Sequence, residues 1–262
     1  MKILVLVKQV PDTATQVKVG ADPRGIDATG ITWIVSPYDE YALEEALRIK
    51  EKRGPTTAVE VVAVTVGPDR AREALRSCLA MGADRAVHVN DPALEGADTL
   101  ATARALAAVM KLEQPKMVLA GRQAIDDDMG AVGAQVAELL GWPCLSWIME
   151  EGISEDGGKV RAGRQVEGGL EVFELPLPCV LTAQKGLNEP RYPTLKGIMG
   201  AKKKEIKDLK AADLGLGELG RELEVVALEA LPPRPPGRIL TGDAKDMARE
   251  LVRALREDVK AI

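Results

Sequence analysis

Residues 117–133, MVLAGRQAIDDDMGAVG, hold the pattern that decides the fold. The apolar start predicts a buried strand, residues 130–140 have the periodicity of a helix, and a polar loop joins the two. Such strand–loop–helix units build parallel sheets covered by helices. Free backbone N–H groups at the helix start attract anions, and Gly130 and Gly133 let a ligand approach the backbone closely.

Three consecutive carboxylates, Asp126, Asp127 and Asp128, lie in the same loop. They would repel a phosphate unless they face away from it, toward ribose hydroxyls, solvent or a cation, and one of them can instead cap the helix. The residues therefore leave three interpretations open: a nucleotide site, helix-start electrostatics and a magnesium site. The loop is neither a P-loop nor a GxGxxG motif.

The same alternation of strand and helix runs through the first two thirds of the chain. We expect a largely parallel α/β sheet flanked by helices. The expected strands cover residues 3–7, 59–66, 86–89 and 117–120, and the expected helices cover residues 37–52, 69–81, 97–112 and 130–140. After residue 142, short segments at 159–164, 170–175 and 179–183 predict antiparallel strands added to this sheet.

Roughly thirty residues separate the first strand from the first helix, which is more than a routine connection needs. We expect a hairpin and a surface loop there, at the edge of the sheet where ligands usually bind. The helix then begins in VSPYDEYALEEA, residues 35–46, where Ser36 or a neighbour can cap it. If this segment and the 121–133 loop flank one cleft, Tyr38 offers a flat face there, and Thr65 and Val66 at the tip of the second expected strand border an adenine ring.

Composition argues against several classes of protein. With 262 residues, 46% hydrophobic residues and a net charge of −5, the chain can build a buried core but lacks the basic character of a nucleic-acid-binding domain. Its apolar runs are shorter than the ~18 residues of a membrane span, and its start lacks a signal-peptide cleavage site. We therefore expect a cytoplasmic protein with no membrane insertion and no nucleic-acid partner.

Residues with catalytic or metal-binding chemistry are sparse. The three cysteines are isolated, without CxxC spacing, which suggests neither a disulfide framework nor a thiolate metal site. The single histidine, His88, has the neighbours of a strand residue, and we expect a structural role for it. With no nucleophile elbow and no paired carboxylates, we expect no catalytic acid, base or nucleophile and no metal.

The segment 164–206 carries the most specific pattern. Prolines stiffen a polar loop, and Thr194 begins a short helix that carries Leu195, Ile198 and Met199 on adjacent turns. These side chains belong either to the core or to a rigid, exposed anchor for a partner protein. The three lysines that follow are either an ordinary solvated face or a means of steering an acidic partner.

The end of the chain is expected to form an extended arm. EALPPRPPGR, residues 229–238, contains prolines that favour an extended, stiff segment. A closing amphipathic helix carries Met247 and Leu251 on its apolar side and docks either on its own domain or on a partner subunit. We divide the chain into a single α/β domain, residues 1–230, and a C-terminal arm, residues 231–262.

Several motifs stand in one order along the chain: KQVPDT, ALEEALR, MGADRAVHV, GRQAIDDD and LNEPRYPTLKGIMGAKKK. In this order they resemble the electron transfer flavoprotein β-subunit family over nearly the whole chain. The resemblance implies a Rossmann-like, nucleotide-binding α/β domain that buries AMP and pairs with a larger α subunit, which holds most of the shared FAD. It also implies electron exchange with acyl-CoA and related dehydrogenases of fatty acid β-oxidation and with a downstream quinone oxidoreductase.

Carried over position by position, the resemblance implies AMP contacts at Leu6, Ser36, Pro37, Tyr38, Asp39, Val66, Gly121, Arg122, Gln123, Ala124, Ile125, Asp126, Asp127, Asp128, Met129, Gly130, Ala131 and Val132. Tyr38 would also lie toward the flavin. Residues 187–199 resemble the loop that docks dehydrogenases, with Leu195 as its apolar anchor. The recognition residues would be Leu187, Asn188, Glu189, Pro190, Arg191, Tyr192, Leu195, Ile198 and Met199.

Three positions depart from the family pattern. Many relatives have Asn where this chain has Ser36 and Thr where it has Val132, so two polar contacts with AMP would be missing. Some members carry an acidic residue directly after the equivalent of Arg164, where it helps to hold the mobile flavin domain. Here Gln165 stands instead.

Two alternatives stay open. A subgroup of the family binds a second FAD in place of AMP and splits electron pairs between acceptors, but its members tend to have glycine where Asp127 adds a charged side chain. AMP is therefore favoured. A free-standing adenine-nucleotide-binding protein would need a glycine-rich, phosphate-gripping loop after the first strand, and KQVPDT has no glycine.

Overall fold

The computed structural model describes residues 1–54, 58–217, 222–234 and 236–262. A nine-stranded sheet forms the centre, in the order β11-β5-β4-β1-β6-β10-β7-β8-β9. Its strands are β1 Lys2–Leu6, β4 Glu60–Val66, β5 Arg85–Val89, β6 Met117–Gly121, β7 Cys144–Ile153, β8 Lys159–Val166, β9 Gly169–Pro176, β10 Cys179–Ala183 and β11 Ile206–Leu209. From β11 to β7 all neighbours are parallel, and β8 and β9 add an antiparallel edge.

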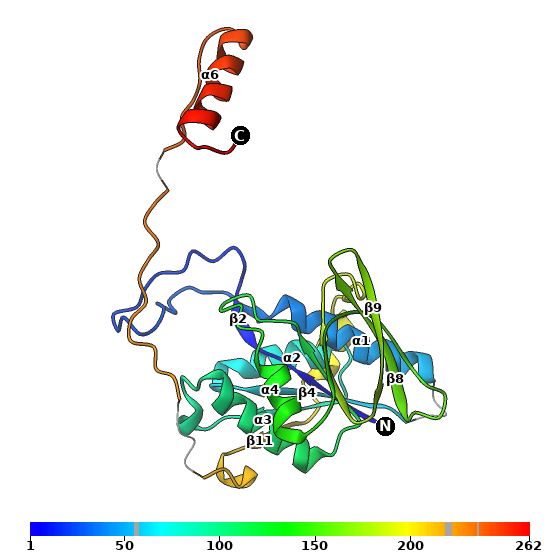
Figure 1. Cartoon of the computed structure of the whole chain (residues 1–262). Coiled ribbons are helices and arrows are strands. Elements are labelled where there is room, and N and C mark those ends of the chain that lie inside the picture. Colours follow the sequence, from blue (N-terminus) through cyan, green and yellow to red (C-terminus); the bar gives the residue numbers. More distant parts are fainter. Residues whose placement is uncertain (55–57, 218–221, 235) are drawn as a thin grey trace.

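Helices cover both faces of this sheet (Figure 1). They are α1 Pro37–Arg53, α2 Arg72–Met81, α3 Thr99–Glu113, α4 Val132–Leu140, α5 Leu195–Ala201 and α6 Ala244–Glu257, with short 3-10 turns η1 Asp69–Ala71, η2 Pro92–Leu94 and η3 Ala212–Leu214. Residues of α1 and α2 pack into one buried cluster, and residues of α3 and α4 pack into another on the opposite face. The expected Rossmann-like α/β architecture is confirmed.

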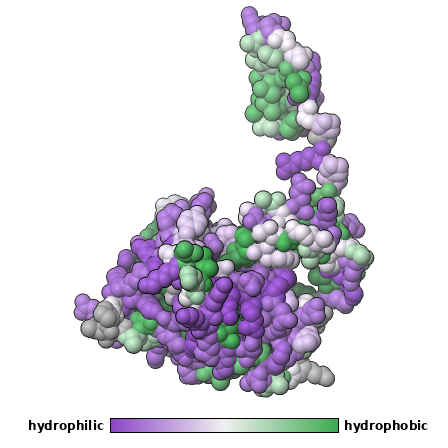
Figure 2. Space-filling model, turned by 180° about the vertical axis from the view of Figure 1, so that it is seen from behind, coloured by the Kyte–Doolittle hydropathy of each residue, from purple (hydrophilic) through white to green (hydrophobic). Residues whose placement is uncertain are grey.

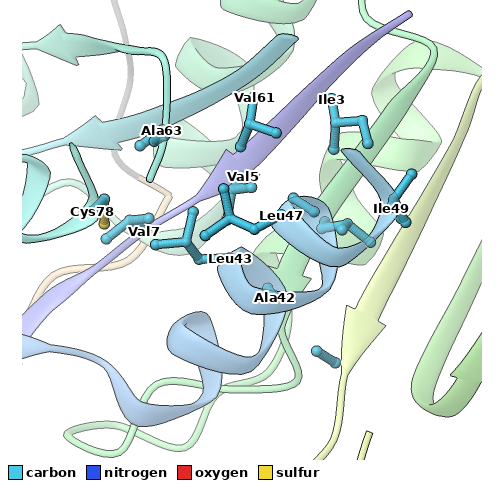
Figure 3. Close-up of a cluster of buried hydrophobic side chains, with 14 of the residues drawn as sticks. Ile3, Val5, Val7, Ala42, Leu43, Leu47, Ile49, Val61, Ala63 and Cys78 are labelled. Carbon is cyan, nitrogen blue, oxygen red and sulfur yellow. The ribbon is translucent and has the colours of Figure 1, made fainter. Parts of the chain in front are cut away.

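Strand β1 shows how the two clusters share the sheet. Ile3 and Val5 point toward α1, where they meet Leu43 and Leu47 (Figure 3), whereas Leu4 and Leu6 belong to the cluster of α3 and α4. A strand that is covered on both sides needs apolar residues at every position, which is why parallel strands read as unbroken apolar runs.

The position of β1 also locates a crevice. The chain passes from β1 to β4 on one side, and β6 pairs with β1 on the other, so the strand order reverses at β1. The helices that follow β1 and β6, which are α1 and α4, lie on opposite faces. Such a reversal leaves an opening at the carboxyl ends of the strands, where open α/β sheets bind their ligands.

One strand differs from its expectation. Residues 179–183 were expected to be antiparallel, but β10 runs parallel between β6 and β7. All five of its residues are buried, as a central strand requires. The antiparallel pair β8 and β9 and the hairpin before the first helix are confirmed, the latter as β2 Gln9–Pro11 paired with β3 Trp33–Val35.

The C-terminal segment leaves the body of the domain (Figure 1). Its first part lies on the domain, where the backbone N–H groups of Glu222 and Leu223 donate to Asp98 Oδ2 and the N–H of Leu228 donates to the Pro23 carbonyl. Pro235, part of the expected proline-rich segment, lies outside the described residues. Helix α6 is capped by Asp243 and buries none of its residues, and its apolar side is visible in Figure 2.

Candidate functional site

A cleft of about 740 Å³ opens at the carboxyl ends of β1, β4 and β6. It coincides with the reversal of strand order, and the loop from Gly121 to Ala131 forms one of its walls. Of the residues expected to contact a nucleotide, the cleft is lined by Leu6, Asp39, Val66, Gly121, Arg122, Gln123, Ala124, Asp127, Met129, Gly130, Ala131 and Val132.

The other expected contact residues lie around the cleft without lining it: Ser36, Pro37, Tyr38, Ile125, Asp126 and Asp128. Pro37 occupies the first turn of α1, but Ser36 does not cap that helix through its side chain. The Ser36 side chain is fully buried, and its Oγ has no hydrogen-bond partner among the described residues.

Gly121 lets α1 approach the tip of β6. A Cβ atom at this position would lie 2.5 Å from Asp39 Oδ1, 2.7 Å from Tyr38 Cβ and 2.8 Å from the Tyr38 carbonyl carbon. These distances are far inside van der Waals contact. The first turn of α1 and the 121–133 loop therefore meet at this glycine, and Asp39 is the one residue of 36–39 that lines the cleft.

Asp39 stabilises the same junction between α1 and β6 through hydrogen bonds. Its Oδ2 accepts the Lys8 backbone N–H at 2.7 Å and its Oδ1 accepts the Gly121 N–H at 2.9 Å, so one carboxyl joins the ends of β1 and β6 to α1. Burial raises the pKa of Asp39 to about 7, against the opposing effect of these N–H groups and of Lys8. Desolvation of a charged carboxylate is the dominant cause.

Asp39→Asn is expected to change how stability depends on pH. The folded-state pKa of Asp39 is about 7, above that of an unfolded carboxyl, so the folded state keeps this proton to higher pH. The free energy of unfolding should therefore fall as pH rises from about 4 to 7, by at most about 1.4 kcal/mol per pH unit, and then level off. The amide cannot titrate and should lack this fall. Urea unfolding of both proteins from pH 4 to 8 measures the difference, and parallel curves would contradict it.

The acidic triplet is held by partners within the domain. Lys8 Nζ donates to Asp126 Oδ1 and to Asp127 Oδ2, both at 2.8 Å, and Gln123 Nε2 donates to Asp128 Oδ1. Burial acts to lower the pKa of Lys8, but the hydrogen bonds to the two carboxylates raise it. No carboxylate caps α4, whose N-cap residue is Ala131, so the helix-cap interpretation is wrong. The helix start keeps its N–H groups free of side-chain caps at the wall of the cleft.

No group of three or more His, Cys, Asp or Glu side chains that could hold a metal ion occurs in the described part of the chain. Among the same residues, no helix combines the length and the apolar content needed to cross a bilayer. His88 is fully buried in β5, with Nε2 2.9 Å from the Gly67 carbonyl oxygen.

The 187–199 loop lies away from the cleft, against α1 and α2. Its residues divide into two groups. Leu187 and Asn188 are buried. Tyr192 is 91% exposed and Leu195 is 76% exposed, and Ile198 and Met199 are exposed beside them, so Leu195 is not a core residue. As expected, Thr194 caps the short helix, accepting the Gly197 N–H at 3.0 Å.

Comparisons with known proteins agree with this architecture. A family model described as "Electron transfer flavoprotein domain" matches residues 25–214. The chain is 42% identical to the electron transfer flavoprotein subunit beta of Bacillus subtilis, with all of both chains covered, and 42% identical to that of Sus scrofa, with 98% of this chain and 97% of the relative covered. The subunit of Thermoanaerobacterium thermosaccharolyticum is 43% identical, covering 97% and 98%. The chain belongs to the electron transfer flavoprotein β-subunit family.

This electron transfer flavoprotein chain has cleft residues that the sequence did not single out. Arg70 lines the cleft, its guanidinium lies 3.5 Å from the centre of the Trp33 ring, and its Nη1 donates to Gln9 Oε1 at 2.7 Å. Arg70 follows the Gly67-Pro68 turn at the end of β4, and this turn is the local sign of its position in the sequence. Its partners come from β2 and β3, some sixty and forty positions away, and sequence patterns do not show such contacts.

A second arginine of the cleft, Arg122, lies between the start of α1 and a tryptophan of β7. The Arg122 guanidinium lies 4.6 Å from the Trp147 ring and 5.3 Å from the Tyr38 ring. Trp147 has a φ of 64° at the irregular pairing of β7 with β10, and its N–H donates to Thr182 Oγ1. This backbone turn interrupts the alternation of buried and exposed residues along β7. Trp147 therefore could not be recognised from the sequence pattern.

Proposed function

We propose that this chain is the β subunit of a heterodimeric electron transfer flavoprotein. It binds AMP as a structural ligand and docks dehydrogenases, so that electrons pass through an FAD held mainly by the α subunit. The observation that carries the proposal is the cleft at the reversal of strand order, lined by twelve of the eighteen residues that the family resemblance associates with AMP.

The chemistry of the cleft suits a nucleoside monophosphate. The uncapped start of α4 offers N–H groups to a phosphate. The nearest acidic side chains do not oppose this, because Lys8 draws Asp126 and Asp127 toward itself. Asp127 nevertheless lines the cleft, and its charged side chain would stand where members that bind a second FAD tend to have glycine. AMP is therefore the occupant we favour.

The side chains also suit a carrier rather than an enzyme. Burial raises the pKa of Cys179 to about 12 and raises that of Cys78 further, so neither thiol forms the reactive thiolate near neutral pH. The buried His88 has no access to a substrate. FAD would supply the redox chemistry, and Tyr38, with Arg122 beside its ring, would lie toward the flavin.

The partners follow from the same proposal. The C-terminal arm, residues 231–262, would pair with the α subunit, and the exposed residues of the 187–199 loop would meet acyl-CoA and related dehydrogenases. A quinone oxidoreductase would take the electrons onward. We place the complex in the cytoplasm.

Nucleotide analysis tests the proposal. The chain is co-expressed with a candidate α subunit, purified and denatured, and the released ligands are measured by mass spectrometry and absorbance. We expect one AMP and one FAD per heterodimer. Two FAD molecules and no AMP would favour the electron-splitting alternative. An adenine nucleotide retained by a chain that forms no heterodimer would favour the free-standing binding protein.

A further inference from the structure

The exposed apolar cluster of Tyr192, Leu195, Ile198 and Met199 stands on a loop that is tied to the domain at several points. We propose that an acidic row on α1, formed by Glu44, Glu45 and Glu51, positions this cluster for docking by holding Arg191 and Asn188. These five are positioning residues: they act on the partner through the cluster that they hold. The inference rests on the docking role proposed above.

Arg191 makes the main tie. Its Nε and Nη2 donate to the two carboxylate oxygens of Glu44 at 2.7 and 2.9 Å, and its Nη1 donates to Glu51 Oε1 at 2.5 Å. The Glu44 side chain is only 6% exposed and that of Arg191 is 34% exposed, so the carboxylate is shielded from water while the guanidinium is partly solvated. A two-pronged arginine–carboxylate pair fixes direction as well as distance. The backbone directly before Tyr192 is thereby oriented.

Asn188 makes a second contact with the same helix, at Tyr41 and Glu45. Its Nδ2 donates to Glu45 Oε2 at 2.7 Å and to the Tyr41 carbonyl oxygen at 3.0 Å, and the side chain is buried. The backbone of Tyr41 and the side chain of Glu45, one turn apart on α1, thus hold the same amide group. The loop is therefore held both at its entry and at Arg191.

The far side of the cluster is fixed to α2. A Cβ atom on Gly197 would lie 2.3 Å from the Ala80 carbonyl oxygen, so the first turn of α5 touches the end of α2. Arg76 Nη1 donates to the Ala201 carbonyl oxygen at 2.6 Å, and Lys204 Nζ donates to the Leu79 carbonyl oxygen at 3.0 Å. The apolar side chains are thus presented between two fixed points.

Fixing an exposed apolar cluster has a physical purpose in binding. A contiguous set of exposed apolar side chains marks an interaction surface. Ordering a loop when a partner arrives costs binding free energy, and a loop that is ordered in advance avoids that cost. The acidic row should therefore act on the affinity for the partner and leave the electron-transfer step at saturation unchanged.

The test uses the heterodimer with FAD bound and an acyl-CoA dehydrogenase as electron donor. Arg191→Lys keeps the charge but removes the two-pronged contact. Loss of preorganisation should raise the apparent KM for the heterodimer about five- to tenfold, with kcat within twofold of the parent. Hydrogen exchange of residues 192–199 should become faster. Flavin content and melting temperature should stay close to those of the parent protein.

Two further variants make the result decisive. Arg48→Ala is the matched control, because Arg48 pairs with the same row, 3.7 Å from Glu45, but from within α1. Arg48→Ala should change neither the apparent KM for the heterodimer nor the rate of hydrogen exchange of residues 192–199. Leu195→Ala removes the apolar anchor itself. It should raise the apparent KM for the heterodimer, while the hydrogen exchange of residues 192–199 stays as slow as in the parent protein.

The outcomes separate the two levels of the proposal. If Leu195→Ala raises KM while Arg191→Lys behaves like Arg48→Ala, docking stands and the positioning role is wrong. If Leu195→Ala leaves KM unchanged, the docking role of the cluster fails. A loss of melting temperature and flavin in Arg191→Lys, with no separate rise in KM, would make the tie a general element of stability and would also overturn the inference.

Discussion

Gly121→Ala is expected to destabilise the domain by about 3 kcal/mol, because overpacking a closed junction typically costs about 1–3 kcal/mol and sometimes more. The added methyl group would meet Asp39 and the backbone of Tyr38, neither of which is the free end of a flexible chain. Either α1 or β6 must move, and the Asp39 bonds to Lys8 and Gly121 would lengthen. AMP should be lost from the purified protein, since the displaced loop forms the wall of the cleft.

Thermal or urea unfolding, with nucleotide analysis of the same sample, measures both effects. Gly152→Ala is the matched control, because Gly152 also lies in the sheet and no atom stands within 4 Å of the place that its added methyl group would take. It should leave stability and nucleotide content almost unchanged. Equal unfolding curves for the two variants would show that the junction is looser than these distances require.

Much of the fold was predictable because the central strands are buried on both faces. Runs such as VVAVTV at residues 61–66 and MVLA at residues 117–120 can be accommodated only inside a covered sheet. The direction of β10 was not predictable in the same way. Strand order depends on which distant segment fills the place between β6 and β7, and the short segment carries no local sign of its neighbours.

In the candidate site, too, some features could be predicted from the sequence and others could not. The loop after β6 was recognisable from its own residues, and so was the first turn of α1. The role of Lys8 was not, because its carboxylate partners lie more than a hundred positions later. Likewise, Arg191 belongs to the recognition motif by sequence, but only the folded chain shows it turned inward to Glu44. The sequence identified the surface loop, but it did not distinguish the residues that hold the loop on the domain from the residues that the loop exposes to a partner.

Truncation after Leu231 is expected to abolish stable pairing with the α subunit while the α/β domain stays folded. The truncated chain keeps the contacts of Leu223 and Leu228 with the domain and loses only the proline-rich segment and α6. Helix α6 buries nothing against its own domain, and its apolar side includes Leu251, which is 49% exposed. An amphipathic helix with an open apolar side needs a surface to cover it.

Gel filtration of the co-expressed subunits and circular dichroism of the truncated chain measure the two parts of this prediction. Covering a large apolar side chain contributes about 1.5–3 kcal/mol, so removing a docked helix with several of them should weaken pairing about 100-fold or more. Leu251→Ser in the full chain should weaken pairing in the same direction by less. An unfolded truncated chain would assign α6 to the core of the domain, and an undisturbed heterodimer would mean that the two subunits are held by the α/β domain alone.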